Sequence, residues 1–205
     1  MTAILLVVAY LLGSLPFGLW LARSEGVDLR ATGSGNIGAT NVLRTTGRML
    51  AAVVLALDSS KGVLAVWLAR LLNGEIEVMV GCAVAVVAGH MWPIWAGFRG
   101  GKGVATAAGA WALVAPVAVV WSVVVFGSIV ATTRYVSAGS VAAALMVPVV
   151  TALLDGRVST SIGAVVLAAL IVWRHRSNLS RLVQGTESRV GTPGVKARRR
   201  GPFVG

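Results

Sequence analysis

The segment whose residue types most plainly suggest chemistry is a glycine-rich basic stretch at residues 89–106, GHMWPIWAGFRGGKGVAT. Residues 99–103 read Arg-Gly-Gly-Lys-Gly, and glycines let backbone N–H groups converge on an anion while neighbouring cations neutralise it. We predict a phosphate-binding turn here; the alternative is a tight basic loop that only follows the charge bias of membrane proteins. It is not a Walker P-loop, because Ala96 stands where the first glycine should be and Gly103 where Ser or Thr should follow the lysine.

A second polar segment, residues 32–41, is rich in hydroxyls, amides and glycines, and Arg44 follows it. These groups suit hydrogen bonding to an oxyanion-rich ligand. Gly33, Gly35 and Gly38 spell G-x-G-x-x-G, but no strand precedes them and no βαβ unit can be drawn, so we exclude a dinucleotide fingerprint. Two interpretations remain, an anion-binding segment and a flexible amphipathic loop.

Two ionisable residues, Asp58 and Lys61, lie inside a long apolar run and are three positions apart. This spacing makes them neighbours on one helix face, and ionisable groups inside a membrane span need partners. They form either a self-satisfying pair that turns the helix toward the protein interior or a pair that orders the glycine-rich segments.

The last polar cluster lies in residues 174–187, RHRSNLSRLVQGTE. Asn178 stands four positions after Arg174, three after His175 and three before Arg181, so one helical face could present several hydrogen-bond donors. A basic helix end could also be only an anchor for lipid headgroups, although His175 and Asn178 are not needed for anchoring.

The elements that carry these residues must lie in a membrane. Hydrophobic residues make up 57% of the 205-residue chain and charged residues 12%, with a mean hydropathy of +0.84, which does not describe a soluble domain. The apolar runs are continuous and do not alternate with period two, so they predict helices and not a barrel. The N-terminal run lacks a basic n-region and is expected to be a spanning helix. The single cysteine, Cys82, excludes an internal disulfide and a cysteine-based metal site.

Six apolar segments are predicted to be helical, at residues 3–22, 50–72, 76–95, 104–132, 139–154 and 160–173. As one helix, residues 104–132 would be about 43 Å long, against a bilayer core of about 30 Å. Pro116 could split this stretch into two helices, both shorter than a normal span.

The placement of Lys and Arg favours the split, because basic residues gather on the cytoplasmic side of short loops. With two helices there, 15 of the 18 basic residues share one side, and only Lys61, Arg70 and Arg157 do not. We therefore predict an all-α integral membrane protein with seven transmembrane helices, some of them short. The N-terminus is expected outside and the C-terminus in the cytoplasm.

Five segments carry a resemblance to a known family: residues 34–44, 58–62, 89–106, 134–140 and 174–187. In the same order, they closely resemble the PlsY family of bacterial acyl-phosphate:glycerol-3-phosphate acyltransferases, over essentially the whole chain up to residue 187. The resemblance implies one multispan domain at residues 1–187 in the bacterial cytoplasmic (inner) membrane, with its active site facing the cytoplasm. Ala138 departs from the usual leucine and could alter the acyl-chain groove. Residues 188–205 have no counterpart, and we expect a disordered basic tail.

The implied reaction transfers a fatty acyl group from acyl phosphate to the 1-hydroxyl of glycerol 3-phosphate, a step of phospholipid biosynthesis. Its products are 1-acylglycerol 3-phosphate (lysophosphatidate) and phosphate. Acyl phosphate is an activated mixed anhydride, so positioning and oxyanion stabilisation suffice without a covalent intermediate. We expect no cofactor and no metal, since the acidic residues are scattered. The expected partners are acyl phosphate, glycerol 3-phosphate and membrane lipid, and a soluble enzyme that makes acyl phosphate is a candidate.

The resemblance also implies roles for single residues. The expected catalytic residues are Ser34, Arg44, Lys102, His175 and Asn178. The expected substrate-binding residues are Asn36, Gly38, Thr40, Asn41, His90, Gly100, Gly101, Gly103, Thr106, Ser137, Arg174, Arg181 and Glu187. Asp58 and Lys61 are expected to order the loops. Glycerol 3-phosphate is assigned to Arg44, Lys102, His175 and Asn178. The acyl phosphate headgroup is assigned to Ser34, Asn36, Gly38, Thr40, Asn41 and Ser137.

Two questions stay open at the level of sequence. The proton acceptor for the attacking hydroxyl is His90, His175 or a phosphate oxygen of the donor; the resemblance favours the last, and His90 could instead make a loop-ordering hydrogen bond. The alternative function is a multispan transporter of phosphate or a phosphate ester, although we find no internal repeat of the kind that transporters usually show. We expect no nucleic-acid partner, because the charge bias of membrane proteins accounts for the net charge of +11.

Overall fold

The computed structural model describes residues 1–191, and within them every regular element is a helix. The elements are α1 (Thr2–Gly13), α2 (Phe17–Ser24), α3 (Ala39–Thr45), α4 (Arg48–Leu72), α5 (Ile76–Met91), the 3₁₀ helix η1 (Ile94–Ala96), α6 (Val104–Trp111), α7 (Pro116–Thr133), α8 (Val136–Leu154), α9 (Val158–Arg174) and α10 (Arg176–Val183). The predicted all-α class is confirmed for this part of the chain. The predicted basic tail falls mostly on residues 192–205, which lie outside the described residues. The backbone N–H of Val190 donates to the carbonyl oxygen of Arg134, and Nε of the Arg134 side chain donates to the carbonyl oxygen of Val190.

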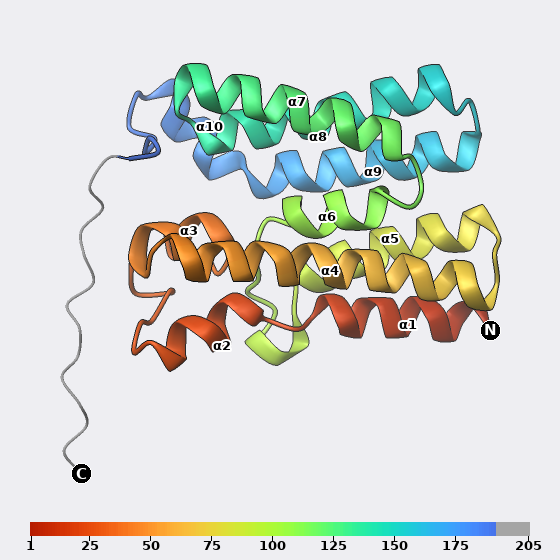
Figure 1. Cartoon of the computed structure of the whole chain (residues 1–205), viewed down its shortest axis with the longest axis horizontal. Coiled ribbons are helices and arrows are strands. Elements are labelled where there is room, and N and C mark those ends of the chain that lie inside the picture. Colours follow the sequence, from red (N-terminus) through yellow and green to blue (C-terminus); the bar gives the residue numbers. More distant parts are fainter. Residues whose placement is uncertain (192–205) are drawn as a thin grey trace, which may run out of the picture.

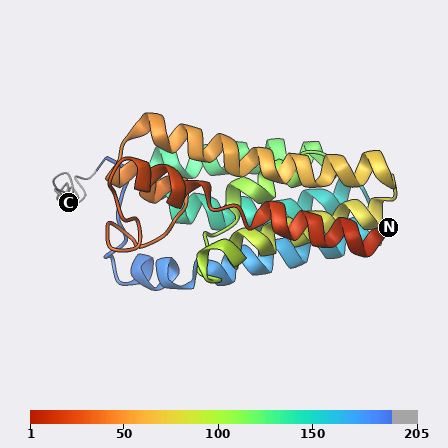
Figure 2. The same cartoon turned by 90° about the horizontal axis from the view of Figure 1, so that it is seen from below.

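The helices form two groups that lie along one long axis (Figure 1). Helices α7, α8 and α9 form one group, α1, α2 and α4 belong to the other, and α6 lies between them. Helix α5 packs against α1, α4 and α9 and so joins the two groups. Both views place α3 and α10 at the end of the molecule away from the N-terminus (Figures 1 and 2). The polar segments near residues 32–45 and 176–187 therefore share one end, as the charge distribution predicts.

Five helical stretches of residues 1–191 are long and apolar enough to cross a membrane, or six if the bent pair α9 and α10 counts as one. Helix α6, with eight residues, is not among them. The stretch 104–132 does divide before Pro116, whose ring fits the first turn of α7. The prediction that both halves are short is wrong for α7, because its 18 residues suffice for a span.

One predicted helix and one predicted helical face are broken. The helix expected at residues 3–22 ends at Gly13 and restarts at Phe17, because Pro16 lacks an N–H group and disfavours a helical conformation at Leu15. The face expected across residues 174–181 is also not continuous, since α9 and α10 meet at His175 with a bend of 57°.

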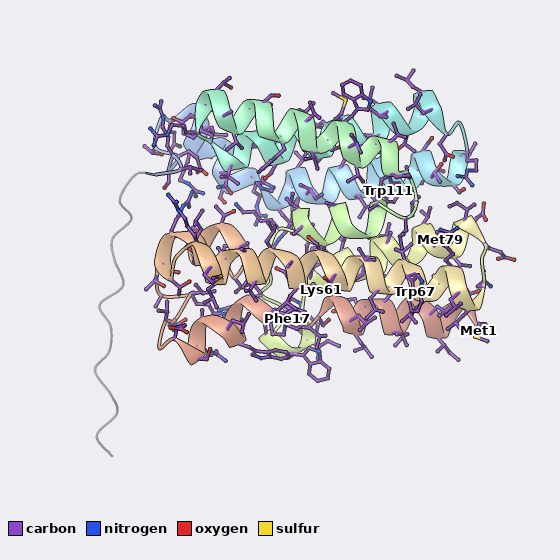
Figure 3. All side chains as sticks on the ribbon, viewed as in Figure 1. Met1, Phe17, Lys61, Trp67, Met79 and Trp111 are labelled. Atoms are coloured by element: carbon purple, nitrogen blue, oxygen red, sulfur yellow. The ribbon has the colours of Figure 1, made fainter. Side chains whose placement is uncertain are left out.

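Lys61 of α4 binds the break between α1 and α2. Its Nζ donates to the carbonyl oxygen of Leu15 at 3.0 Å and lies 2.8 Å from Oδ1 of Asp58. Both charged side chains are almost fully buried, and Nζ also lies 5.6 Å from the centre of the Phe17 ring, beside Lys61 in Figure 3. The predicted Asp58–Lys61 pair is thus confirmed, and it also satisfies a carbonyl that the helix break leaves without a helical partner.

Glycines bring α6 close to α4. A Cβ atom on Gly109 would lie 2.0 Å from the carbonyl oxygen of Ser59, and one on Gly62 would lie 2.2 Å from that of Thr106. Each helix therefore places a glycine against the backbone of the other. This contact fixes α6, and with it the glycine-rich segment that precedes it.

Candidate active site

A cavity of about 420 Å³ lies between the two groups of helices and receives side chains from most of the bundle. Its polar lining includes most of the predicted site residues: Ser34, Asn36, Gly38, Thr40, Asn41, Arg44, Asp58, His90, Lys102, Gly103, Ser137, His175, Asn178 and Glu187. Its apolar lining comes largely from α6 to α9 and includes Trp111, Val119, Phe126, Ala143, Val147, Leu167 and Ile171. One cavity therefore offers cations and hydrogen-bond donors together with a surface for a hydrocarbon chain.

Glu187 is the centre of the polar network. Its Oε1 accepts hydrogen bonds from Nδ2 of Asn178 at 2.6 Å and from Oγ of Ser137 at 2.9 Å, and its Oε2 accepts one from Nε of Arg181 at 2.7 Å. The other end of the Asn178 amide, Oδ1, accepts a hydrogen bond from Nζ of Lys102 at 2.5 Å. One buried carboxylate thus fixes an amide that in turn holds the lysine of the glycine-rich segment.

Positively charged groups outnumber negatively charged ones around this network. Burial opposes ionisation of Glu187, but hydrogen bonds from Asn178, Arg181 and Ser137 outweigh it and lower the pKa of the carboxyl group. Burial is also the main reason that the pKa of Lys102 is lowered to about 8; Glu187 opposes this effect, while nearby arginines add to it. Burial likewise lowers the pKa of the Arg44 guanidinium. Several cations therefore face one carboxylate, which leaves positive charge for an anionic ligand.

His175 lies at the bend between α9 and α10 and is buried. Its Nδ1 is 2.8 Å from the carbonyl oxygen of Ile171. Because a carbonyl can only accept a hydrogen bond, Nδ1 carries the proton, and Nε2 of the neutral ring is left as an acceptor. The imidazole can therefore take a hydrogen bond from a ligand, or donate one once it is protonated.

His90 lies differently, at the last turn of α5. Its Nδ1 is 3.5 Å from Oδ1 of Asp58, and its ring packs against the backbone of Gly101, where a Cβ atom would lie 2.1 Å from Nε2. A Cβ atom added to Gly100 would lie 2.1 Å from the carbonyl oxygen of His90. Both ring nitrogens of His90 therefore lie against the protein, so its geometry fits the loop-ordering alternative.

Two arginines hold the glycine-rich segment from outside the cavity. Arg174 donates through Nε to the carbonyl oxygen of Gly101 at 3.0 Å and through Nη2 to that of Gly100 at 2.8 Å. Arg30 donates to the carbonyl oxygen of Ala96 at 2.5 Å. These bonds are loop contacts, and Arg174 does not line the cavity.

Asn41 orders the polar segment at residues 32–41. Its Nδ2 donates to two backbone carbonyls at 3.1 Å, and its Oδ1 accepts the backbone N–H of Ser34 at 2.9 Å. Oδ1 of Asn36 accepts the N–H of Gly38 at 2.9 Å, which leaves its amide nitrogen for a ligand. The side-chain amide of Asn41 is thus bonded within the loop, whereas the side-chain amide nitrogen of Asn36 can still donate a hydrogen bond to a ligand.

The predicted residues that do not line the cavity are Lys61, Gly100, Gly101, Thr106, Arg174 and Arg181. Arg181 reaches the site through Glu187, and Thr106 is fully buried in the contact between α4 and α6. Within residues 1–191, Oγ1 of Thr106 is the one buried side-chain oxygen or nitrogen without a hydrogen-bond partner. Sequence reasoning missed Arg30 and the apolar lining, above all Trp111, because a tryptophan beside a cavity and one in a core have the same pattern in the sequence.

The chain matches known proteins over nearly its whole length. The family model described as Glycerol-3-phosphate acyltransferase matches residues 3–185. A glycerol-3-phosphate acyltransferase of Desulforamulus reducens is 44% identical over 93% of this chain and 96% of its own. That of Geobacter sulfurreducens is 46% identical over 91% and 96%, and that of Gluconobacter oxydans 50% identical over 91% and 92%.

Two solved structures have the same fold. They are crystal structures of PlsY, described as an integral membrane glycerol 3-phosphate acyltransferase, in glycerol 3-phosphate and lysophosphatidic acid forms. The first is 41% identical with a TM-score of 0.89, the second 40% identical with a TM-score of 0.87, and each covers 93% of this chain and 96% of its own. Together with its apolar helices, these likenesses make this chain a multi-pass membrane protein, and the chain belongs to the PlsY family of glycerol-3-phosphate acyltransferases.

Proposed function

We propose that the protein transfers a fatty acyl group from acyl phosphate to the 1-hydroxyl of glycerol 3-phosphate, releasing phosphate and 1-acylglycerol 3-phosphate. The observation that carries this proposal is the single cavity in which Lys102, Arg44 and His175 share a space with the apolar side chains of α6 to α9. A phosphorylated polar acceptor and a donor with a hydrocarbon tail both find matching surfaces there. Family membership favours an acyltransferase over the alternative of a phosphate or phosphate-ester transporter.

Glycerol 3-phosphate is assigned to Arg44, Lys102, His175 and Asn178. Lys102 and Asn178 are already in contact, at 2.5 Å between Nζ and Oδ1, and both line the cavity. The cations would neutralise the acceptor phosphate, and the amide would orient it. Glu187 supports the arrangement by holding Asn178 from behind.

The acyl phosphate headgroup is assigned to the segment with Ser34, Asn36, Gly38 and Thr40, together with Ser137. Thr40 and Ser137 line the same cavity from opposite groups of helices, α3 and α8. Ser137 is also bonded to Glu187, so it would connect the two substrate sites. The acyl chain would lie along the apolar lining, which continues from these polar residues.

The reaction needs one bond exchange. The hydroxyl oxygen of glycerol 3-phosphate attacks the acyl carbonyl carbon, the bond between that carbon and the phosphate oxygen breaks, and its electron pair leaves with phosphate. The hydroxyl proton passes to a phosphate oxygen of the donor, so the leaving group departs as hydrogen phosphate. The protein contributes positioning and positive charge near the developing oxyanion.

Phosphate release by the purified protein tests the proposal. The protein in detergent or lipid receives palmitoyl phosphate and glycerol 3-phosphate, with acyl-CoA and acyl-carrier protein as alternative donors. Release that requires both substrates and yields lysophosphatidate is expected. Turnover with acyl-CoA alone would overturn the donor assignment, and net uptake of glycerol phosphate by sealed vesicles without a donor would favour the transporter.

The role of His175 as a binding group has its own test. Nε2 is the ring nitrogen without a protein hydrogen bond within residues 1–191, so His175→Ala should raise the KM for glycerol 3-phosphate and leave kcat within about threefold of the wild type. His90→Ala is the matched comparison, because His90 lies against the loop. A fall in kcat of about 100-fold or more in the His175 variant would instead identify this ring as the base.

We also propose seven membrane crossings, with α6 as the short one, an outside N-terminus and an active site that faces the cytoplasm of a bacterial inner membrane. The shared end of α3 and α10 supports this arrangement, because the basic segments gather there. A soluble enzyme that makes acyl phosphate could deliver the donor at the same end.

A further inference from the structure

A second concavity, of about 460 Å³, lies outside the active-site cavity between α2, η1 and the loop that follows η1. Three arginines line it, Arg23, Arg30 and Arg99, together with Trp20 and Trp95. It shares no residue with the cavity described above. The proposed reaction therefore leaves it without a role.

The charges of this concavity are not balanced by protein groups. None of the ion pairs formed within residues 1–191 involves the three arginines, and the side chains of Arg23 and Arg99 make no hydrogen bond there. Among residues 1–191, the guanidinium of Arg30 donates only to the backbone carbonyls of Ala96 and Arg99. Asp28 accepts the backbone N–H of Arg30 and not its side chain. Three exposed arginines thus line one concavity without a carboxylate partner in the described part of the chain, which is the charge arrangement of a phosphate site.

The position of the concavity points to the source of the phosphate. Trp20 and Arg23 lie in the last turns of the candidate span Thr2–Ser24, and Trp95 lies at the end of the span Ile76–Ala96. Trp20, Trp95 and Phe98 are 46%, 57% and 59% exposed, which in a membrane protein places them against lipid. Aromatic side chains at the ends of spans lie at headgroup level, and basic pockets between spans bind anionic headgroups.

We propose that this concavity binds the headgroup of an anionic phospholipid, with its phosphate among the guanidinium groups of Arg23, Arg30 and Arg99 and its acyl chains along Trp20 and Trp95. The lipid would also steady the active site. Arg30 and Arg99 belong to the network that holds residues 96–101, and Lys102 follows directly on that segment. The proposal rests on the membrane location of the protein and not on the reaction that it catalyses.

The test is native mass spectrometry of the full chain, released from detergent that contains equal amounts of phosphatidylglycerol and phosphatidylcholine. The wild type should retain phosphatidylglycerol in preference to phosphatidylcholine. The double variant Arg23→Gln/Arg99→Gln should bind phosphatidylglycerol about 30-fold more weakly, which corresponds to two basic residues at an anionic surface. Arg70→Gln removes one arginine charge at the far end of α4, where Arg70 is exposed, and should bind like the wild type.

A second measurement uses brominated lipids. Brominated phosphatidylglycerol should quench tryptophan fluorescence of the wild type more strongly than brominated phosphatidylcholine does, and Trp20→Phe/Trp95→Phe should reduce this difference. Equal retention of both lipids, or unchanged retention in the double arginine variant, overturns the proposal. Displacement of the lipid by millimolar inorganic phosphate would show a soluble-phosphate site and would overturn the lipid assignment. None of these readouts requires turnover, so a failure of the proposed reaction leaves them unaffected.

Discussion

Lys102 is the residue on which the electrostatics of the site depend most directly. Burial lowers its pKa to about 8, so its charge changes close to physiological pH. Its Nζ is held by Asn178, and Asn178 is held by Glu187, which is buried and bonded to three side chains. The position of the cation is therefore fixed by the network, while its charge depends on pH.

This predicts a pH dependence of substrate affinity. Above a pH of about 8, Lys102 loses its proton in the free enzyme, whereas a phosphate monoester is already a dianion above about pH 7. The KM for glycerol 3-phosphate should therefore rise as pH rises through about 8, by up to about tenfold per pH unit. Because a bound phosphate raises the pKa of a neighbouring lysine, kcat should change less over the same range. Initial rates between pH 6.5 and 9.5 measure both.

The control is Lys102→Arg, whose guanidinium stays charged over this range. Its KM, even if higher at every pH, should not rise across pH 8. A wild-type KM that stays constant between pH 7 and 9 would contradict the assignment of Lys102 to the acceptor phosphate.

At the scale of elements, α6 positions the site, but this short helix is held in place by its neighbours. It has eight residues and is fixed by the glycine contacts with α4. The segment before it folds back on α5, where the N–H groups of Gly100 and Gly101 bond to the carbonyls of Met91 and His90, both at 3.1 Å. Lys102 thus depends on the packing of α4, α5 and α6 together.

Gly109→Ala tests this dependence. The added Cβ would lie 2.0 Å from the Ser59 carbonyl oxygen, which is backbone and cannot turn away, so α6 must shift. We expect a loss of roughly 1–3 kcal/mol in stability and a raised KM for both substrates. Thermal unfolding in detergent and initial rates measure the two effects.

Gly127→Ala on α7 is the matched control, because within residues 1–191 no atom beyond the local backbone of α7 lies within 4 Å of its added Cβ. Replacing a glycine inside a helix should leave activity unchanged and raise stability by roughly 0.5–1 kcal/mol. If both variants behaved alike, the close approach of α4 and α6 would not be what positions the site.

At the scale of the whole molecule, the cavity depends on both groups of helices. Trp111 of α6 is buried, lines the cavity and donates from Nε1 to Oγ1 of Thr151 at 3.4 Å. Figure 3 places Trp111 nearer than Lys61 to the end of the molecule where Met1 lies. Its indole ring is therefore a candidate limit to the length of the bound acyl chain.

Trp111→Phe should shift donor preference toward longer chains, because a smaller ring leaves more room in the apolar part of the cavity. We expect the ratio of kcat/KM for stearoyl phosphate over palmitoyl phosphate to rise about tenfold. Trp121→Phe on α7 is the control, since Trp121 is exposed and does not line the cavity. An unchanged ratio in the Trp111 variant would exclude this residue as the limit.

Membrane orientation is a prediction at the same scale. After Cys82→Ser, a cysteine placed by Glu75→Cys between α4 and α5 should react with a membrane-impermeant maleimide in intact cells. One placed by Ser177→Cys in α10 should react only after lysis. The reverse pattern would invert the orientation, and reaction of both from one side would contradict the count of seven crossings.

The sequence by itself determined the membrane class, the helical class and most of the residues that meet in the cavity. Hydropathy acts locally, because each apolar run in lipid must satisfy its own backbone and therefore becomes a helix. The Asp58–Lys61 pair could be predicted for the same reason, since its geometry depends only on a spacing of three residues along one helix. The polar motifs also identified the family.

Only the tertiary structure decided how the motifs are connected. Lys102 and Asn178 are 76 residues apart, and Lys61 and Leu15 are 46 apart, so their contacts depend on how helices pack and not on local spacing. The same holds for Arg174, which lies on the glycine-rich loop and not in the cavity, and for the bend at His175. Packing fixed these partners because a buried polar group takes whichever donor or acceptor the neighbouring helix brings within reach, and no pattern within a single helix records that neighbour.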